Sequence, residues 1–396
     1  TYTGAPPPTS AWGITDLAMR VLHLYKAYPP IKGGIENTVE LLAEAQAAAG
    51  HEVSVMVSSP DRRTHRDRIH GVEVVRVGRL LELASTPLSP LLPWHVWRRQ
   101  PDIVHLHAPF PPAEAANLAF GRARRSVITW HSDVVRQRRI LKVYGPLLER
   151  VLQRVDRVFP TSEAYVRRSD FLRPVAHKCQ VVPLGIDLSP FLQPEPSRAA
   201  KYRLAWSAPP GGHTERPRPV VLFVGRLREY KGLPHLIEAL PRTDANLCIA
   251  GDGPEGGRLR SLVRRRGLTD RVHFAGHLPD DRLPAAYQAA DVFVLPSHRP
   301  SEAFGLVSVE AMASGLPVVC TELGTGTSEV VQHESTGLVV PPANPDALAN
   351  ALNRLLGDTD LRHRLGANGQ RRARSEYAAP VYVRRTQAAY EEVLGE

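Results

Sequence analysis

The sequence predicts two α/β domains of similar size, each built on a doubly wound, mainly parallel sheet. Short apolar runs alternate with helical patterns along both halves of the chain, as in parallel sheets covered by helices. The alternation breaks once, across a proline-rich segment at 190–219. A length of 396 residues also allows two domains. We therefore expect two Rossmann-like domains facing a central cleft.

The first predicted domain spans residues 19–189, after a flexible tail at 1–18. Its first helical pattern runs through Ala49 and stops at Gly50, a residue that often ends helices. Apolar runs predict strands at 21–25, 53–57, 72–77, 103–107, 126–130 and 157–160.

The second predicted domain spans residues 220–378, after a linker at 190–219 in which we expect a short helix near 197–205. Apolar runs predict strands at 220–224, 247–250, 272–274, 292–295 and 317–321. The chain is helical from 345 onward, and we expect its last helix, 379–396, to pack back on the first domain. Ligands of open α/β sheets bind at the carboxyl ends of strands, so the chemistry is expected there.

The composition favours an anionic partner and a cytoplasmic protein. The net charge is +10, which suits nucleic acid, anionic lipid or a diphosphate, although it also fits a merely solubilising surface. No apolar stretch has the length of a membrane span. The three cysteines have no metal-type spacing, which favours free thiols in a reducing compartment.

The most informative stretch is 301–321, where a loop leads from a strand into a helix expected to start near Phe304. Glu302 precedes this helix, and Glu310 lies on its second turn. The free amides at a helix start attract an anion, and carboxylates accept hydrogen bonds from sugar hydroxyls. The stretch therefore predicts a diphosphate cradle flanked by two carboxylates, unless Glu302 only caps the helix and Glu310 faces solvent.

A second motif, Gly225 to Gly232, follows a predicted buried strand. It places Arg226 and Lys231 at the carboxyl end of that strand, where two cations can neutralise a departing diphosphate. The alternative is a surface loop with ordinary basic residues.

The first domain offers two weaker signals. Gly33 and Gly34 allow a tight turn that points amides at a ligand. His131 follows a strand in the run Thr-Trp-His-Ser-Asp, where it is either functional or structural.

Together these motifs resemble the retaining glycosyltransferases of family four, which have the GT-B fold. The resemblance runs from Met19 onward and rests on Glu302-x7-Glu310, Val-Gly-Arg-Leu with the downstream Lys-Gly, and Val-Pro-Leu-Gly-Ile-Asp at 182–187. It implies a metal-independent transfer from a nucleotide-sugar, without a cofactor.

The resemblance also implies a role for each motif. Arg226 and Lys231, after Gly225, would hold the donor diphosphate. Glu302 would contact the transferred sugar, and Glu310 the ribose hydroxyls. The remaining implied positions are Phe304, Gly305 and Leu306 on the sugar, His131 beside it, Gly33 and Gly34 on the phosphate or acceptor, and Gly276, His277 and Leu278 around the base.

Further motifs resemble bacterial mannosyltransferases of O-antigen and exopolysaccharide assembly. They are Gly-Gly-Ile-Glu at 33–36, Trp-His-Ser-Asp-Val-Val-Arg-Gln at 130–137 and Glu-Leu-Gly-Thr-Gly-Thr-Ser at 322–328. This implies GDP-mannose as donor and a polyprenyl-diphosphate-linked or other glycan as acceptor.

The first domain also predicts a membrane-facing surface. Trp94 and Trp97 lie beside Arg98 and Arg99, with further basic residues at 122–125 and 136–142. Tryptophan with lysine or arginine is typical of anchors on anionic lipid. Packed tryptophans on a solvated face are the alternative, so peripheral location at the inner face of the plasma membrane is an open hypothesis.

Other functions remain as alternatives. A UDP-sugar-dependent transferase with a small-molecule or lipid acceptor would keep the same fold. A sugar-nucleotide epimerase would turn over UDP-sugar without acceptor, and a relative without catalysis would only bind the donor. A nucleic-acid-binding protein would explain the charge, but the sequence has no aromatic RNA motif, zinc spacing or helix-turn-helix pattern, and we expect no nucleic-acid partner.

Overall fold

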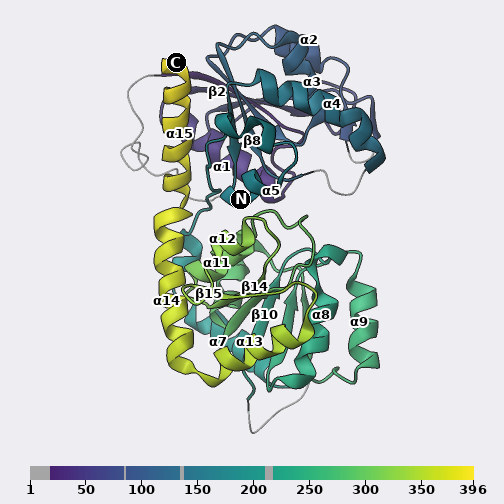
Figure 1. The fold of residues 1–396 in the computed structure, drawn as a ribbon, viewed down its shortest axis with the longest axis vertical. Coiled ribbons are helices and arrows are strands. Elements are labelled where there is room, and N and C mark those ends of the chain that lie inside the picture. The colour runs from purple at the N-terminus through teal and green to yellow at the C-terminus, as the bar shows by residue number, and fades with distance from the viewer. Residues whose placement is uncertain (1–17, 84–85, 134–137, 210–216) are drawn as a thin grey trace. The chain divides into compact units, whose positions relative to one another are not determined.

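The computed structural model describes residues 18–83, 86–133, 138–209 and 217–396. The tail expected at 1–18 and the prolines and glycines around 210–212 therefore lie almost entirely outside the described residues. The chain divides into two compact units, one with residues up to Ile186 together with Ala379–Glu396, the other with Asp187–Ala378 (Figure 1). Each unit holds one central sheet.

The sheet of the first unit has the order β3-β4-β2-β1-β7-β8-β9. All its pairs are parallel except β3 with β4. Its strands are β1 Arg20–Leu24, β2 Glu52–Ser58, β3 His65–Ile69, β4 Val72–Val77, β7 Ile103–Ala108, β8 Arg125–Trp130 and β9 Arg157–Pro160. A separate hairpin joins β5 Leu81–Leu83 and β6 Thr86–Leu88.

Helices contact this sheet in two groups. The helices are α1 Gly34–Ala48, α2 Leu92–Trp97, α3 Pro111–Phe120, α4 Arg138–Arg154, α5 Glu163–Arg168 and α15 Ala379–Gly395. Helix α1 contacts α15, β2 and β4, whereas α3 contacts α2, α4 and β7. The C-terminal helix α15 thus belongs to the first unit.

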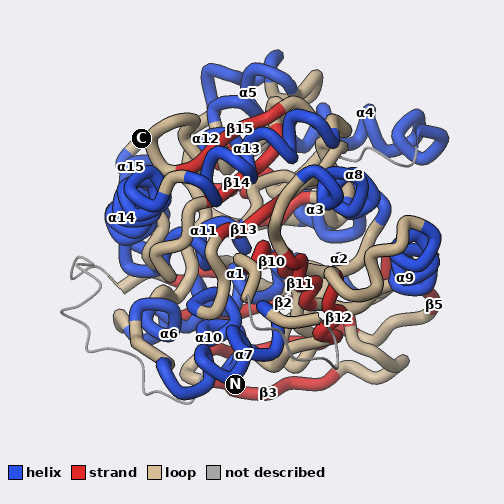
Figure 2. Tube along the Cα trace, turned by 90° about the horizontal axis from the view of Figure 1, so that it is seen from below, coloured by secondary structure: helices blue, strands red, loops and turns tan. Residues whose placement is uncertain are grey.

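The sheet of the second unit is wholly parallel and has the order β12-β11-β10-β13-β14-β15. Its strands are β10 Val220–Val224, β11 Asn246–Ala250, β12 Val272–Gly276, β13 Val292–Leu295, β14 Val318–Thr321 and β15 Gly337–Val340. Figure 2 shows β10, β11 and β12 side by side. The strand predicted at 317–321 is not the last of this sheet, as the list of predicted strands implied, because β15 pairs beyond it.

The helices of the second unit also form two groups. They are α6 Ser189–Leu192, α7 Pro196–Ser207, α8 Leu233–Ala239, α9 Gly256–Arg265, α10 Leu283–Gln288, α11 Leu306–Ala313, α12 Thr327–Val330, α13 Pro345–Gly357 and α14 Thr359–Glu376. Helix α8 contacts α9 and α13, whereas α10 contacts α7 and α11, and α11 contacts α14. Helix α7, within the segment predicted as linker, contacts β10 and β11. Within the described ranges, no helix combines the length and apolarity needed to cross a bilayer.

Candidate active site

The centre of the candidate site in the second unit is an ion pair between Lys231 and Glu302. The Lys231 Nζ lies 2.6 Å from Glu302 Oε2, and the two side chains are only 9% and 10% exposed. The Ser297 hydroxyl donates to the same oxygen at 2.9 Å. Thr325 Oγ1 donates to the Glu302 carbonyl at 2.8 Å, which fixes the backbone of the loop. The structure thus joins the two predicted motifs through buried charges.

The carboxyl group of Glu302 gives the buried amine of Lys231 a charge partner. Burial is the largest single effect on the pKa of Lys231 and lowers it, but the charge and hydrogen bond of Glu302, together with the charges of Tyr230 and Glu310, outweigh burial, so the pKa is raised above its usual value. A buried charge is tolerated only with such a partner. The site therefore holds a preformed cation at the carboxyl end of β10.

Glycines with positive φ shape the loops that carry this pair. Gly232, next to Lys231, has φ +70°, and a Cβ there would overlap the Pro296 carbonyl oxygen. Gly305 has φ +80°, and a Cβ would lie 2.8 Å from Leu295 Cδ2. Only glycine adopts these conformations without strain, so the two loops can approach β13 closely.

Helix α11 begins at Leu306, two residues later than expected, because Gly305 is its left-handed N-cap. In its first turn the Ser308 amide donates to the Gly305 carbonyl at 2.8 Å, whereas the amides of Leu306 and Val307 precede the first intrahelical acceptor and are available to an anion. Phe304 is buried instead and packs edge-on against Tyr377, with ring centroids 5.7 Å apart. Phe304 can therefore offer its backbone but hardly its ring to a ligand.

Glu310 lies on α11 and accepts a 2.7 Å hydrogen bond from the Tyr287 hydroxyl. Burial raises the pKa of Glu310 to about 7, against the lowering effects of Tyr287 and Lys231. The carboxyl group can therefore exchange its proton near neutral pH, and it is positioned by a tyrosine that the sequence did not reveal.

The remaining predicted donor residues lie at neighbouring strand ends. Arg226 is exposed, and its side chain makes no hydrogen bond or ion pair with any described residue. Gly276 ends β12 with φ +67°, and the next amide, of His277, donates to Asp252 Oδ2 at 3.0 Å. His277 is exposed, and Leu278 is half-buried. The structure thus places the predicted base loop beside the loop that follows β11.

In the first unit, Gly33 caps α1 and Gly34 is its first residue. A Cβ at Gly33 would overlap the Glu36 carboxylate, which lies 3.8 Å from Lys26 Nζ. This carboxylate is the end of a flexible side chain, so a side chain at position 33 would require Glu36 to move.

His131 follows β8 and is 3% exposed. Its Nε2 lies 3.2 Å from His107 Nδ1, whereas its Nδ1 has no hydrogen-bond partner among the described residues. Burial lowers the pKa of His131 to about 3, so the ring is neutral.

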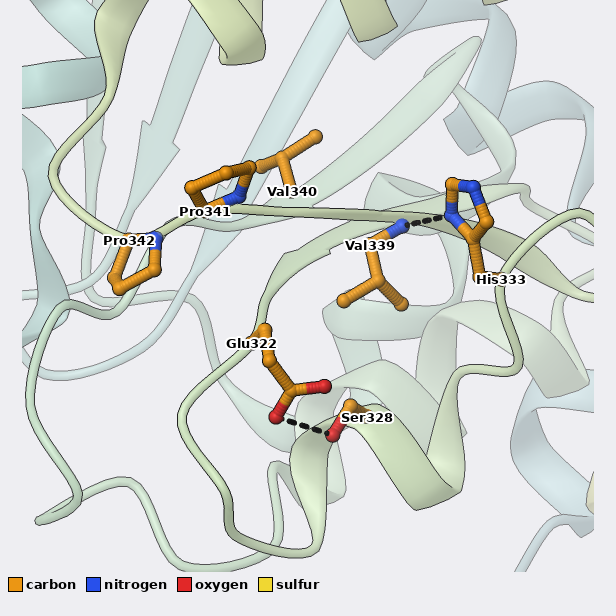
Figure 3. A pocket seen from close by; sticks show the side chains of 7 residues that line it. All are labelled: Glu322, Ser328, His333, Val339, Val340, Pro341 and Pro342. Atoms are coloured by element: carbon orange, nitrogen blue, oxygen red, sulfur yellow. Dashed lines mark hydrogen bonds between the residues drawn. The ribbon is translucent and has the colours of Figure 1, made fainter.

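A pocket of about 500 Å³ lies apart from these residues, where β14 and β15 end (Figure 3). In it Ser328 donates to Glu322 at 2.9 Å, and the Val339 amide donates to His333 Nδ1 at 3.0 Å. Glu322 and Ser328 bound the 322–328 motif, and the pocket contains none of the predicted site residues.

Known proteins resemble the chain along nearly its whole length. Residues 32–190 match the family Glycosyltransferase Family 4, and residues 211–372 match Glycosyl transferases group 1. An O-antigen chain mannosyltransferase C from Escherichia coli is 35% identical, over 91% of this chain and 95% of that protein. A D-rhamnosyltransferase from Pseudomonas aeruginosa is 36% identical, over 91% and 93%.

Two further comparisons agree. A GDP-mannose-dependent mannosyltransferase of phosphatidylinositol monomannoside from Mycobacterium tuberculosis is 31% identical, over 89% of this chain and 92% of that protein. The solved structure of a sucrose-phosphate synthase from Thermosynechococcus elongatus has a TM-score of 0.77 and 25% identity, over 95% of this chain and 99% of that one. The chain therefore belongs to the GT-B glycosyltransferases, with a family 4 domain followed by a group 1 domain.

Proposed function

We propose that this glycosyltransferase moves mannose from GDP-mannose to a hydroxyl group of a lipid-linked saccharide, with retention of configuration, in cell-surface polysaccharide synthesis. The observation that carries the proposal is the buried Lys231–Glu302 pair beside the start of α11. It offers a cation for a diphosphate and a carboxylate for sugar hydroxyls within one small region. The similarity to mannosyltransferases supports mannose, and one relative whose name specifies GDP-mannose supports the base.

In this proposal the second unit binds the donor. Arg226 and Lys231 neutralise the diphosphate, and the first amides of α11 add donors at the same charge. Glu302 accepts hydrogen bonds from the sugar, and Glu310 from the ribose. Gly276 to Leu278 line the base. In the first unit, His131 lies beside the sugar, and Gly33 and Gly34 approach the phosphate or the acceptor.

The reaction breaks the bond between the sugar and the diphosphate with oxocarbenium-like character. The acceptor hydroxyl attacks from the face that the diphosphate leaves, and a leaving phosphate oxygen takes the hydroxyl proton. We favour this over a double displacement on Glu302, because Glu302 Oε2 is already engaged by Lys231 and Ser297. Isolation of a glycosyl-Glu302 adduct would overturn this choice.

A thermal-shift comparison tests the donor. GDP and GDP-mannose are expected to raise the melting temperature of the native protein but not of Arg226→Ala. A ligand at a hundredfold excess over its dissociation constant stabilises the native state by about 2.7 kcal/mol. A larger shift with UDP-sugars would leave a glycosyltransferase with a different donor, and a response to no nucleotide would refute the donor site. GDP-6-deoxymannose belongs in the comparison, because one relative transfers D-rhamnose.

We also propose that the first unit docks on an anionic membrane, which would bring the enzyme to a lipid-linked acceptor. Trp94 and Trp97 are 45% and 49% exposed. The Arg98 guanidinium lies 4.8 Å from the centre of the Trp94 ring, and that of Arg122 lies 5.8 Å from the Trp97 ring. Aromatic rings paired with cations suit the interface of an anionic bilayer. Arg136, named for the same surface, lies outside the described residues.

Flotation with vesicles containing phosphatidylserine tests this docking. The native protein is expected to float at low salt, and a Trp94→Ala/Trp97→Ala variant to float less. Leu204→Ala, at an exposed apolar residue of the second unit, is the control. Absence of the native protein from the floating fraction at low salt would refute the membrane proposal and leave the transferase proposal intact.

A further inference from the structure

Four histidines lie in one buried layer of the first unit. His23 is on β1, His105 and His107 are on β7, and His131 follows β8; none is more than 3% exposed. The register places His23 opposite His105 and His107 opposite Thr129. Gln46 of α1 and Tyr390 of α15 complete the layer through hydrogen bonds to His23 and His105.

Three of these histidines form a hydrogen-bonded chain that ends on Gln46. His131 Nε2 lies 3.2 Å from His107 Nδ1, and His107 Nε2 lies 3.0 Å from His23 Nδ1. His23 Nε2 then lies 2.8 Å from the Gln46 side-chain oxygen. His105 stands outside this chain, because its nitrogens meet Tyr390 and Thr129.

The same rings could be considered as metal ligands, since one nitrogen from each of His23, His105 and His107 falls within 4.8 Å of the others. All six nitrogens of these three rings, however, already lie within hydrogen-bond distance of another ring or side chain. A hydrogen-bonded chain therefore accounts for the geometry better than a metal site does.

The chain has a direction because its rings are neutral. Burial lowers the pKa of His23 to about 4 and that of His131 to about 3, and it also lowers the pKa of His107. A neutral imidazole has one N–H donor and one acceptor nitrogen. The Gln46 oxygen can only accept, so His23 must donate from Nε2 and accept at Nδ1. The same constraint passes through His107 and makes His131 donate from Nε2.

The far end of the chain is therefore an acceptor. His131 Nδ1 keeps its lone pair, and this buried nitrogen has no partner among the described residues. Leaving a buried acceptor unpaired is unfavourable, and since no described residue supplies a donor, a bound ligand can supply one. The nitrogen lies where β8 ends, the edge of a parallel sheet at which ligands bind.

We propose that Gln46, His23 and His107 are positioning residues that hold His131 in its Nε2–H tautomer, so that Nδ1 accepts a hydrogen bond from a sugar hydroxyl of the substrate. The identity of this ligand rests on the proposed function. Sugar hydroxyls can donate to the lone pair, whereas an ionised phosphate cannot. His131 Nδ1 is thus assigned to the sugar and excluded from the diphosphate.

The tautomers can be read directly from long-range proton–nitrogen NMR correlations of ¹⁵N-histidine-labelled protein, assigned with His131→Gln and His107→Gln. In the ligand-free native protein, His131 is expected to show a protonated Nε2 and an unprotonated Nδ1. A rotated Gln46 amide would reverse every donor and acceptor along the chain. An Nδ1–H tautomer at His131 would therefore overturn the proposal, as would stoichiometric zinc bound to these rings.

Gln46→Met tests the origin of the tautomer, because methionine fills similar space without an amide. His131 is expected to become a mixture of tautomers, and kcat/KM to fall roughly 2- to 10-fold, the loss of one neutral hydrogen bond. Thr129→Val is the matched control: it removes a hydrogen bond of His105 in the same layer but leaves the chain intact. An unchanged His131 tautomer in Gln46→Met would refute the positioning role. If Gln46→Met does not fold, the tautomer of His131 in the native protein still tests the proposal.

A second NMR experiment compares the His131 signals of the native protein with GDP-mannose and with GDP. A change at His131 Nδ1 with GDP-mannose but not with GDP supports a sugar hydroxyl as the partner, and equal changes with both overturn it. A wrong donor would show differently, as a missing thermal shift with GDP-mannose, and would not alter the tautomer of the ligand-free protein.

Discussion

The ion pair at the centre of the site predicts a difference between the two basic residues of one loop. In Lys231→Met, the Glu302 carboxylate keeps Ser297 but loses its buried counter-charge. Removing one partner of a buried ion pair costs about 3–5 kcal/mol. We expect Lys231→Met to lower the free energy of unfolding of the second unit by an amount in this range. Arg226→Met, at an exposed side chain, should change it by less than about 0.5 kcal/mol.

This difference is measured by urea unfolding of each variant, with hydrogen exchange of the β10 and β13 amides as the readout for the second unit. The double variant Lys231→Met/Glu302→Gln is the internal control, because it removes both charges and should recover most of the loss. Lys231→Met and Arg226→Met should each bind GDP more weakly than the native protein, by about 1.5–3 kcal/mol, the contribution of a charge-assisted hydrogen bond. Equal stability of Lys231→Met and the native protein would refute the reasoning, and so would a double variant no more stable than Lys231→Met.

Three further predictions concern other parts of the site. Because burial raises the pKa of Glu310 to about 7 in the folded state, its contribution to stability is present below its ordinary pKa of 4.5 and is lost as pH rises through about 7. Glu310→Gln should therefore be more stable than the native protein at pH 8, by at most about 3 kcal/mol, but not at pH 4. If urea unfolding gives the same difference in free energy between the two proteins at both pH values, this prediction is wrong. Gly232→Ala should lose about 1–3 kcal/mol from strain at φ +70°, whereas Gly257→Ala, with nothing within 4 Å of its Cβ, should be neutral or stabilising; comparable thermal shifts of the two would count against the strain argument. Transferase activity should survive EDTA, and a loss restored by Mn²⁺ would disprove metal independence.

Most of the two sheets could be predicted because their central strands are continuous apolar runs. β10 and β13, for example, are buried at every position and contain only valine, leucine and phenylalanine. The edge strands lack this signal. β3 reads His-Arg-Asp-Arg-Ile and is mostly exposed, so it forms through pairing with β4 rather than through burial. β15 is only four residues long and begins with glycine, which made it resemble a loop.

The proline-rich segment at the domain boundary holds a helix where the sequence predicted one, near 197–205. This helix is α7, and Pro196 occupies its first position. Proline suits this position because its missing amide would have no partner there anyway. Ala199 and Trp206 then bury α7 against the second unit.

The site could be predicted as motifs but not as a network. Three strands and three helices separate Lys231 from Glu302 in the sequence, and only the adjacency of β10 and β13 brings their charges together. Tyr287 and Ser297 gave no signal, because a lone tyrosine or serine is common anywhere.

The buried histidine chain did leave a signal in the sequence, in the alternation Ile-Val-His-Leu-His of β7. A period of two puts His105 and His107 on the same face of one strand, and the sheet order β1-β7-β8 adds His23 and His131 from its neighbours. Two histidines on one fully buried face are costly unless each nitrogen finds a partner. The pattern therefore implied a buried polar layer, whereas the direction of its hydrogen bonds depends on the Gln46 amide, which only the structure brings to His23. The predicted residue His131 is best understood as the end of that layer rather than as a single histidine at a strand end.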